Sequence, residues 1–369
     1  MTTPPLRERL RARVSASRRT LADVGVAVLV AASAAMGGLV LDNALPVGAA
    51  PVTFSALRWA FMIAFLVGLI LCVAYRRRVY QGTGTLYSLS FLDETMLDYH
   101  EQAQSDAASG HMAVRLLGRR VDVLGRERDG AVDVVQPRQE LSRALESAMN
   151  QDRDDTGYAV APVLLWPAAL AIGASLTRTD RIRFLDYDKK TTTEFRLRNK
   201  EFERVAIRTK PDHIVPEPTG DRRGVLLSFT PAAAKFDIDR RCGEFGVSEL
   251  ALLDPQPHVQ GRLLTGPELA RLADDLAGHL ADIKRTTRNR ELVIVAFLPK
   301  TVALLTGWYL SRQQVRFFAG TYLMHYLQPP DDRFVAMRVH PSQPTAFPSP
   351  WSEASPPSSV TGHSPLRRV

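Results

Sequence analysis

The sequence predicts an α/β protein made of two tandem Rossmann-like units that follow a two-helix hairpin. Three observations support this class: two apolar segments near the N-terminus, near-continuous apolar strands further along, and a repeat of those strands. Apolar strands that alternate with helices are typical of a parallel sheet covered on both faces. The two copies therefore predict a pseudo-two-fold pair of units.

Two apolar segments near the N-terminus are each long enough to cross a bilayer. They occupy about residues 24–41 and 57–75. At about 1.5 Å of rise per residue, each spans roughly the ~30 Å hydrocarbon core. The sequence thus predicts a two-span transmembrane hairpin over residues 21–80, preceded by a basic cytoplasmic segment over residues 1–20.

The positive charge is concentrated around these segments. Residues 1–80 hold ten arginines and three acidic residues, whereas the whole chain has a net charge of +8. This distribution is not the footprint of a DNA- or RNA-binding face, so no nucleic-acid polymer is expected as a partner. Arginines precede the first segment and directly follow the second. By the positive-inside rule, we expect both termini and the soluble domain to lie in the cytoplasm.

An alternative interpretation makes the first segment a cleaved signal peptide with an A-x-A site at Ala32–Ala34. The second segment would then stop transfer, and the large domain would remain cytoplasmic.

No signature of catalysis, of a metal site or of a cofactor stands out in the sequence. The two cysteines, Cys72 and Cys242, cannot form a disulfide framework, and the eight histidines are scattered. The run Asp186–Lys190 is compatible with a metal-nuclease site, but a polar turn at a strand end is the favoured interpretation. We therefore expect a protein that is not an enzyme and holds no cofactor.

An internal repeat organises the soluble part. Each copy contains an apolar strand, a proline where the strand ends, a short apolar helix with a glycine, and a second apolar strand. Matching positions are Ser90 and Ser228, Pro167 and Pro299, and Gly173 and Gly307, which lie 138, 132 and 134 residues apart. Three correspondences in the same order favour a real duplication.

The repeat sets the predicted boundaries. They are 81–210 for the first unit, 211–223 for a linker, 224–340 for the second unit, and 341–369 for a disordered Pro/Ser-rich tail. The apolar stretch Val160–Leu176 has an alternative interpretation as a third membrane span. Two prolines interrupt it, so a buried strand followed by a helix is the prediction.

The carboxyl ends of the strands predict the ligand site. Ligands of open parallel sheets bind there, next to helix N-termini whose dipole and free amides favour phosphate. The candidate ligand-binding residues are Trp166, Tyr187, Ser228, Phe229, Thr230, Pro299, Lys300 and Thr301. Lys300 supplies a charge and Thr301 a hydroxyl, while Trp166 offers a ring for base stacking. Helix capping and core packing are the ordinary alternatives for the single residues. Together the residues predict a twinned phosphate-and-base pocket.

Two stretches carry a family resemblance. LARLADDLAGHLADIKRTTRNRELVIVAFLPKTVALLTGWYLSRQQVRFF and the preceding GVLLSFTPAAAKFDID are similar to SAVED domains, the sensors of effectors in CBASS anti-phage systems. The resemblance covers roughly residues 85–340. It implies two fused CARF-like units that bind a cyclic oligonucleotide made by a partner nucleotidyltransferase. It also implies homo-oligomerisation on ligand binding and activation of a fused effector.

The N-terminal hairpin resembles the transmembrane-fused type of SAVED effector. No fused catalytic domain is visible, so the expected action is disruption of the lipid bilayer. Two alternatives stay open: a membrane-anchored α/β enzyme that acts on a nucleotide or sugar nucleotide, and a membrane scaffold without a ligand. The first unit departs more from the family pattern, which puts its ligand contacts in doubt.

Overall fold

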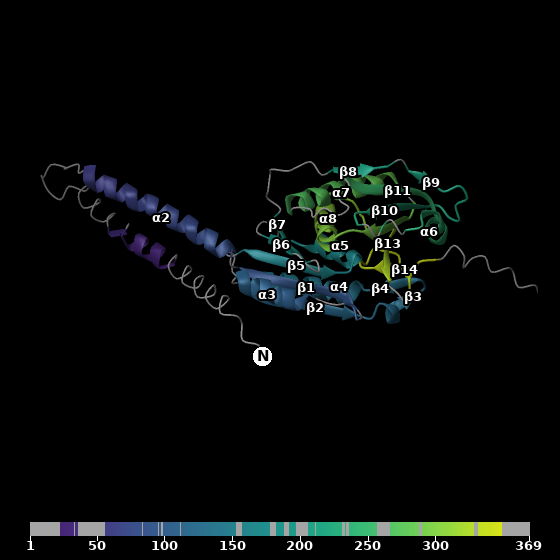
Figure 1. Cartoon of the computed structure of the whole chain (residues 1–369), viewed down its shortest axis with the longest axis horizontal. Coiled ribbons are helices and arrows are strands. Elements are labelled where there is room, and N and C mark those ends of the chain that lie inside the picture. The colour runs from purple at the N-terminus through teal and green to yellow at the C-terminus, as the bar shows by residue number, and fades with distance from the viewer. Residues whose placement is uncertain are drawn as a thin grey trace, which may run out of the picture.

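The structure is a computed structural model of the chain. It describes residues 23–32, 34–35, 56–82, 84–94, 96, 99–110, 112–152, 157–177, 182–187, 192–196, 206–210, 212–230, 233, 236–256, 266–287, 290–327 and 331–348. Figure 1 shows two sheets with helices α5 and α8 between them, and the long helix α2 projecting from one end.

The first sheet has the strand order β2-β1-β5-β6-β7. Its strands are β1 (Thr85–Asp93), β2 (Ala113–Val121), β5 (Tyr158–Leu164), β6 (Ile182–Tyr187) and β7 (Thr192–Arg196). The first four strands in this order run parallel, and β7 adds an antiparallel edge. The connecting helices are α3 (His100–Gly110), α4 (Val135–Gln151) and α5 (Trp166–Ser175).

The second sheet has the order β3-β4-β14-β13-β12-β10-β11-β8, with β9 also paired to β11. Its central strands are β10 (Arg222–Ser228), β11 (Val247–Gln256), β12 (Leu292–Phe297), β13 (Thr321–Leu327) and β14 (Arg333–Arg338). Short strands extend both sides: β3 (Glu127–Arg128), β4 (Ala131–Asp133), β8 (Ala206–Thr209) and β9 (His213–Ile214). The helices are α6 (Ile238–Phe245), α7 (Gly266–Thr286) and α8 (Lys300–Arg312), and the short 3₁₀ helix η1 (Leu124–Arg126) precedes β3.

Strand register shows the repeat. In the first sheet Thr85 is opposite Tyr158, and Tyr158 is opposite Ile182. In the second sheet Arg223 is opposite Leu292, and Leu292 is opposite Thr321. Each copy therefore places its first strand between the second and third and ends on an antiparallel strand. The predicted α/β class with parallel sheets is confirmed.

Helices α5 and α8 cross at the two glycines of the repeat. A Cβ atom on Gly173 would lie 1.8 Å from the Leu304 carbonyl oxygen, and one on Gly307 would lie 1.9 Å from the Leu170 carbonyl oxygen. This reciprocal contact marks the pseudo-two-fold axis. The stretch Val160–Leu176 forms most of strand β5 and the ten-residue helix α5, as predicted. Both elements are buried inside the protein, which accounts for their apolar sequence.

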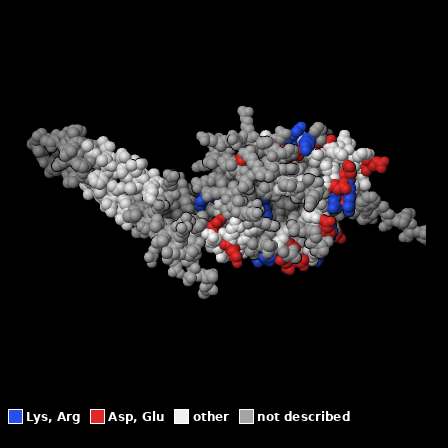
Figure 2. Space-filling model, in the orientation of Figure 1, with Lys and Arg blue, Asp and Glu red and all other residues white. Residues whose placement is uncertain are grey.

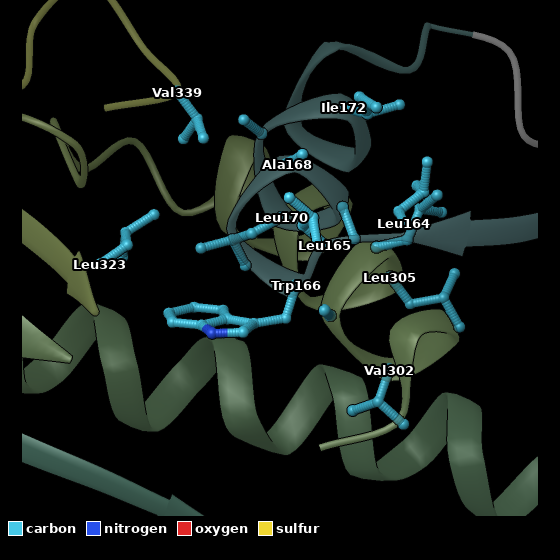
Figure 3. Close-up of a cluster of buried hydrophobic side chains, with 14 of the residues drawn as sticks. Leu164, Leu165, Trp166, Ala168, Leu170, Ile172, Val302, Leu305, Leu323 and Val339 are labelled. Atoms are coloured by element: carbon cyan, nitrogen blue, oxygen red, sulfur yellow. The ribbon is translucent and has the colours of Figure 1, made fainter. Parts of the chain in front are cut away.

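One hydrophobic core lies between the two sheets and joins both units. It includes Leu89 and Phe91 of β1, Leu272 and Leu276 of α7, and Leu323 of β13. Figure 3 shows part of this core around α5 and α8. The outer faces of the sheets have separate smaller cores, beneath α3 in the first unit and α6 in the second. The two units thus form one packed body.

Strands β3 and β4 correct the predicted boundary of the first unit. They belong to its sequence range, yet β4 pairs with β14 of the second sheet. Arg338 forms an ion pair with Asp133, and Arg333 forms one with Glu127. The hydrogen bond from Arg333 lowers the pKa of Glu127. The two ion pairs, together with the buried side chains of Ala131 and Val132, link this short segment to the second unit.

The predicted linker and the predicted disordered tail both contain residues that the structure places in ordered elements or contacts. The predicted linker over residues 211–223 contains β9 and the first two residues of β10. Residues 341–348 of the predicted disordered tail pack against the body: the buried Gln343 side chain accepts hydrogen bonds from the Val339 and His340 amides at 2.7 and 2.9 Å. The Phe347 ring contacts that of Tyr322, with centroids 4.9 Å apart. Composition alone indicated disorder because it does not register such specific contacts. Residues 349–369 lie outside the described part.

Two helical segments pack together at the N-terminus. Helix α2 (Ala56–Gly82) runs alongside helical residues 23–32, and Arg76 Nε donates to Asp23 Oδ1 at 2.8 Å. The apolar side chains of Ile63, Ile70 and Leu71 on α2 are more than half exposed. Figure 2 accordingly shows the described stretch of α2 in white over most of its length.

The predicted membrane spans are described only in part. Among the described residues, no helix combines the length and the apolar character that crossing a membrane requires. Residues 36–41 of the first predicted span and the basic segment 1–20 lie outside the described part.

Candidate functional site

The N-terminus of α8 lies at the carboxyl end of the second sheet. Pro299 precedes the helix in an extended conformation and offers no side-chain cap. The first intrahelical bond there runs from the Ala303 amide to the Pro299 carbonyl, at 3.1 Å. Amides in the first turn of a helix have no carbonyl four residues back, so this end attracts anions.

Lys300 opens α8 and reaches across to the first unit. Its Nζ atom lies 5.3 Å from the centre of the Tyr99 ring, which follows β1. The contact is a cation–π interaction. It places the start of α8 next to the residue that precedes α3 of the first unit.

The predicted residues at the end of β10 lie on the neighbouring strand. Ser228 is opposite Phe297, two residues before Pro299. The Phe229 amide donates to the Phe297 carbonyl at 3.0 Å, and the Phe229 side chain is buried. The structure therefore brings Ser228, Phe229 and Thr230 to the same edge as Pro299 and Lys300.

Trp166 occupies the position in α5 that Lys300 occupies in α8, since each is the first residue of its helix. Its side chain is only 8% exposed, and its ring lies by Leu227, Leu276 and Leu280. Figure 3 shows the ring directed toward the long helix α7. The predicted stacking face is therefore not accessible in this conformation, because the ring fills space between the units. The indole Nε1 is buried without a partner among the described residues.

Thr301 and Tyr187 complete the predicted set. Thr301 is fully buried, and its hydroxyl has no hydrogen-bond partner among the described residues. Tyr187 ends β6 opposite Thr192, and its side chain lies outside the described part. The side chains of the run Asp186–Lys190 are likewise not described. No group of three His, Cys, Asp or Glu residues is placed to hold a metal ion in the part the structure describes.

Asp93 and His325 are not among the predicted ligand-binding residues. Asp93 ends β1 in phase with Leu89 and Phe91, and His325 lies on β13 in phase with Leu323, so both are on the strand faces that form the inter-unit core. Burial lowers the pKa of His325 to about 4, although the charge of Asp93 acts to raise it. Each is a polar side chain at a position of its strand where the pattern expects an apolar one, and this signal is visible in the sequence.

Residues 141–317 match the SAVED family. Its model is described as the SMODS-associated and fused to various effectors sensor domain. We call residues 141–317 the SAVED region. It extends from α4 to the residues after α8 and so includes the α5–α8 crossing. The predicted resemblance is thus confirmed for this region. No curated protein matches the chain significantly.

Solved structures of SAVED/CARF-domain receptors are similar at low identity. The Acinetobacter baumannii Cap4 receptor with the cyclic trinucleotide 2'3'3'-cAAA has a TM-score of 0.43 and 12% identity, covering 74% of this chain and 55% of that one. The Moraxella osloensis Cap4 receptor has a TM-score of 0.39 and 9% identity, covering 74% and 53%. The chain therefore spans about half the length of these receptors.

Proposed function

We propose that this protein is a sensor that binds a cyclic oligonucleotide between its two units. The observation that carries the proposal is the SAVED match over residues 141–317, because that family is described as a sensor domain. The fold supports it, since two Rossmann-like units share one core and meet at the α5–α8 crossing. A pair of related units suits a ligand with repeated nucleotides.

The start of α8 is the proposed phosphate contact. Lys300 supplies a positive charge, and the first-turn amides supply donors to a phosphate oxygen. Ser228 and Thr230 on the adjoining strand end add hydroxyl groups. Binding would draw Lys300 away from Tyr99 and leave that ring available to a base.

The proposal extends to an anti-phage effector in the bacterial inner membrane, with both termini and the sensor in the cytoplasm. A partner nucleotidyltransferase supplies the ligand, and the ligand drives homo-oligomerisation. The clustered N-terminal helices then disrupt the bilayer. Support for this part comes from the arginine-flanked apolar segments of the sequence and from the exposed apolar side chains of α2.

Two other functions compete with the sensor. A membrane-anchored enzyme acting on a nucleotide or sugar nucleotide would need acid, base or metal groups at the strand ends, where Asp93 and His325 are the described titratable pair. A ligand-free scaffold would give the phosphate contact at α8 no role. We propose the sensor over both because the SAVED description names that role.

A panel of cyclic di- and trinucleotides tests the proposal. The full chain in detergent should gain thermal stability with at least one ring and none with the linear oligonucleotides of the same sequence, because a ligand that binds only the folded state stabilises it. Turnover of a nucleotide without a stabilising ring would favour the enzyme. No response to any ring would contradict the sensor.

Dye release from liposomes tests the membrane step separately. The ring that binds should release dye from liposomes that hold the protein. A variant with Ala31, Ala35 and Gly38 replaced together by Leu should bind the ring equally but release less dye, because small residues allow close helix contact. Equal release by this variant would remove that face from the assembly.

A further inference from the structure

A charged side chain of one unit covers an aromatic ring of the other at the proposed phosphate contact. Lys300 is the first residue of α8, and its Nζ atom lies 5.3 Å from the centre of the Tyr99 ring. Tyr99 directly precedes α3 of the first unit. Both residues are partly exposed. A ligand at the start of α8 therefore meets both of them at the surface of the protein.

The first unit fixes the Tyr99 ring in place. The Tyr99 carbonyl accepts the first hydrogen bond of α3, from the Ala103 amide at 2.9 Å. Its side chain packs against the buried cluster beneath α3, which includes Leu92 and Ala103. Lys300 instead carries its charge on a flexible four-carbon stem. Of the two partners, the ammonium group is therefore the one that a ligand can relocate.

One face of an aromatic ring holds either a cation or a nucleobase. The negative face of the ring attracts the ammonium group, and the same face can stack on a base. An ammonium group that leaves the ring for a phosphate exchanges a cation–π contact for charge-assisted hydrogen bonds, which are stronger. A ligand that brings a phosphate therefore uncovers the ring for its own base. A ligand without a phosphate offers the displaced charge no partner.

We propose that Tyr99 is a base-stacking residue whose ring is covered by Lys300 until a phosphate relocates the ammonium group. This inference rests on the proposed sensor function and adds a specificity-determining residue to it. Because the two steps are coupled, the site selects ligands that carry a phosphate and a base together. Free nucleosides and inorganic phosphate each supply only half of the exchange. Stacking accepts every base, so Tyr99 sets this selectivity without setting base identity.

Three replacements at position 99 separate covering from stacking. Calorimetry on the full chain in detergent measures the affinity for the cyclic di- or trinucleotide that stabilises the chain most. Tyr99→Leu should weaken binding by about threefold or more, because stacking on a base is the stronger of the two contacts. Pentafluorophenylalanine at position 99 keeps a flat ring but removes its negative face. It should tighten binding by about two- to fivefold relative to Tyr99→Phe, which corresponds to the ~0.5–1 kcal/mol of an exposed cation–π contact.

Adenosine tests the coupling, because it has a base and no phosphate. Followed by saturation-transfer NMR, it should bind Lys300→Met more tightly than the unmodified chain, since the ring is then uncovered. The cyclic nucleotide should bind the same variant more weakly. Misfolding cannot produce these opposite changes, because it weakens the binding of both ligands. Tyr309→Leu removes a partly exposed ring near the other end of α8, and as the matched control it should change neither affinity.

Three results would each overturn the inference and leave the sensor function standing. The first is binding of the cyclic nucleotide to Tyr99→Leu as tightly as to the unmodified chain. The second is no gain of affinity with pentafluorophenylalanine over Tyr99→Phe. The third is no gain of adenosine binding in Lys300→Met. If no cyclic di- or trinucleotide binds at all, the sensor function itself fails.

Discussion

The α5–α8 crossing predicts that replacing glycine by alanine changes the free energy of unfolding in opposite directions on α8 and on α7. Gly307→Ala adds a methyl group that would lie 1.9 Å from the Leu170 carbonyl oxygen. Glycine to alanine normally stabilises a helix interior by about 1 kcal/mol. Gly278 on α7 is the matched control for this ordinary stabilisation, because a Cβ there would meet nothing within 4 Å.

The magnitude follows from the contact. An ordinary van der Waals approach for a carbon is about 3.5 Å, so the helices must separate by roughly 1.5 Å at the crossing. Overpacking of a core costs about 1–3 kcal/mol, and here the obstacle is backbone that cannot rotate away. We expect Gly307→Ala to lower the free energy of unfolding by about 3 kcal/mol. Gly278→Ala should raise it by up to about 1 kcal/mol.

Urea unfolding, followed by tryptophan fluorescence and by circular dichroism, measures both variants. The chain carries Trp166 and Trp308 in or next to this core, so fluorescence reports on the crossing. Gly173→Ala should behave like Gly307→Ala because the contact is reciprocal. If Gly307→Ala proves as stable as Gly278→Ala, the two helices do not meet as described, and the shared core between the units must be reconsidered.

Three further outcomes follow. Lys300→Glu should weaken ring binding at least tenfold, about 1.4 kcal/mol in calorimetry, whereas Arg285→Glu at the far end of α7 should not change it. Gln343→Ala should lower the free energy of unfolding by about 3 kcal/mol, because it leaves buried backbone amides without an acceptor; truncation after residue 348 should leave chemical denaturation unchanged. Burial lowers the pKa of His325 to about 4 in the folded chain, below the ~6.5 of an unfolded chain. The neutral His325 side chain therefore makes its full contribution to the free energy of unfolding above about pH 6.5. That contribution declines as the pH falls toward 4, by up to about 3 kcal/mol. The unfolding free energy of His325→Phe, measured from pH 7 to pH 5, should lack this decline.

Local periodicity was enough to predict the duplicated α/β units. The offsets of the paired prolines and glycines located α5 and α8 and the strands around them, since both copies must fit the same crossing. Gly173 and Gly307 had a physical reason to recur: each allows the carbonyl of the opposite helix to approach.

Features that depend on contacts between distant segments were not predictable in the same way. Strand β4 joins the second sheet through only three residue pairs, too few to leave a pattern in the sequence. Trp166 was predicted to offer a ring for base stacking, but its side chain is only 8% exposed and lies by Leu276 and Leu280 of α7. Residues 341–348 have the composition of a disordered tail and are held by the side chains of Gln343 and Phe347.

The candidate site was predicted in part. The strand ends and Lys300 followed from the general rule for parallel sheets. Asp93 and His325 were not predicted as ligand-binding residues, because each is a single polar residue in an apolar strand. Only the three-dimensional arrangement places them on facing sides of one core.

Stoichiometry of ring binding tests the central claim most directly. The two units share one core, so the full chain should bind one cyclic oligonucleotide per chain in calorimetry, and Lys300→Glu should weaken that single event. Two independent rings per chain would show that the units act separately. The absence of binding by every cyclic di- and trinucleotide would contradict the account of this protein as a sensor.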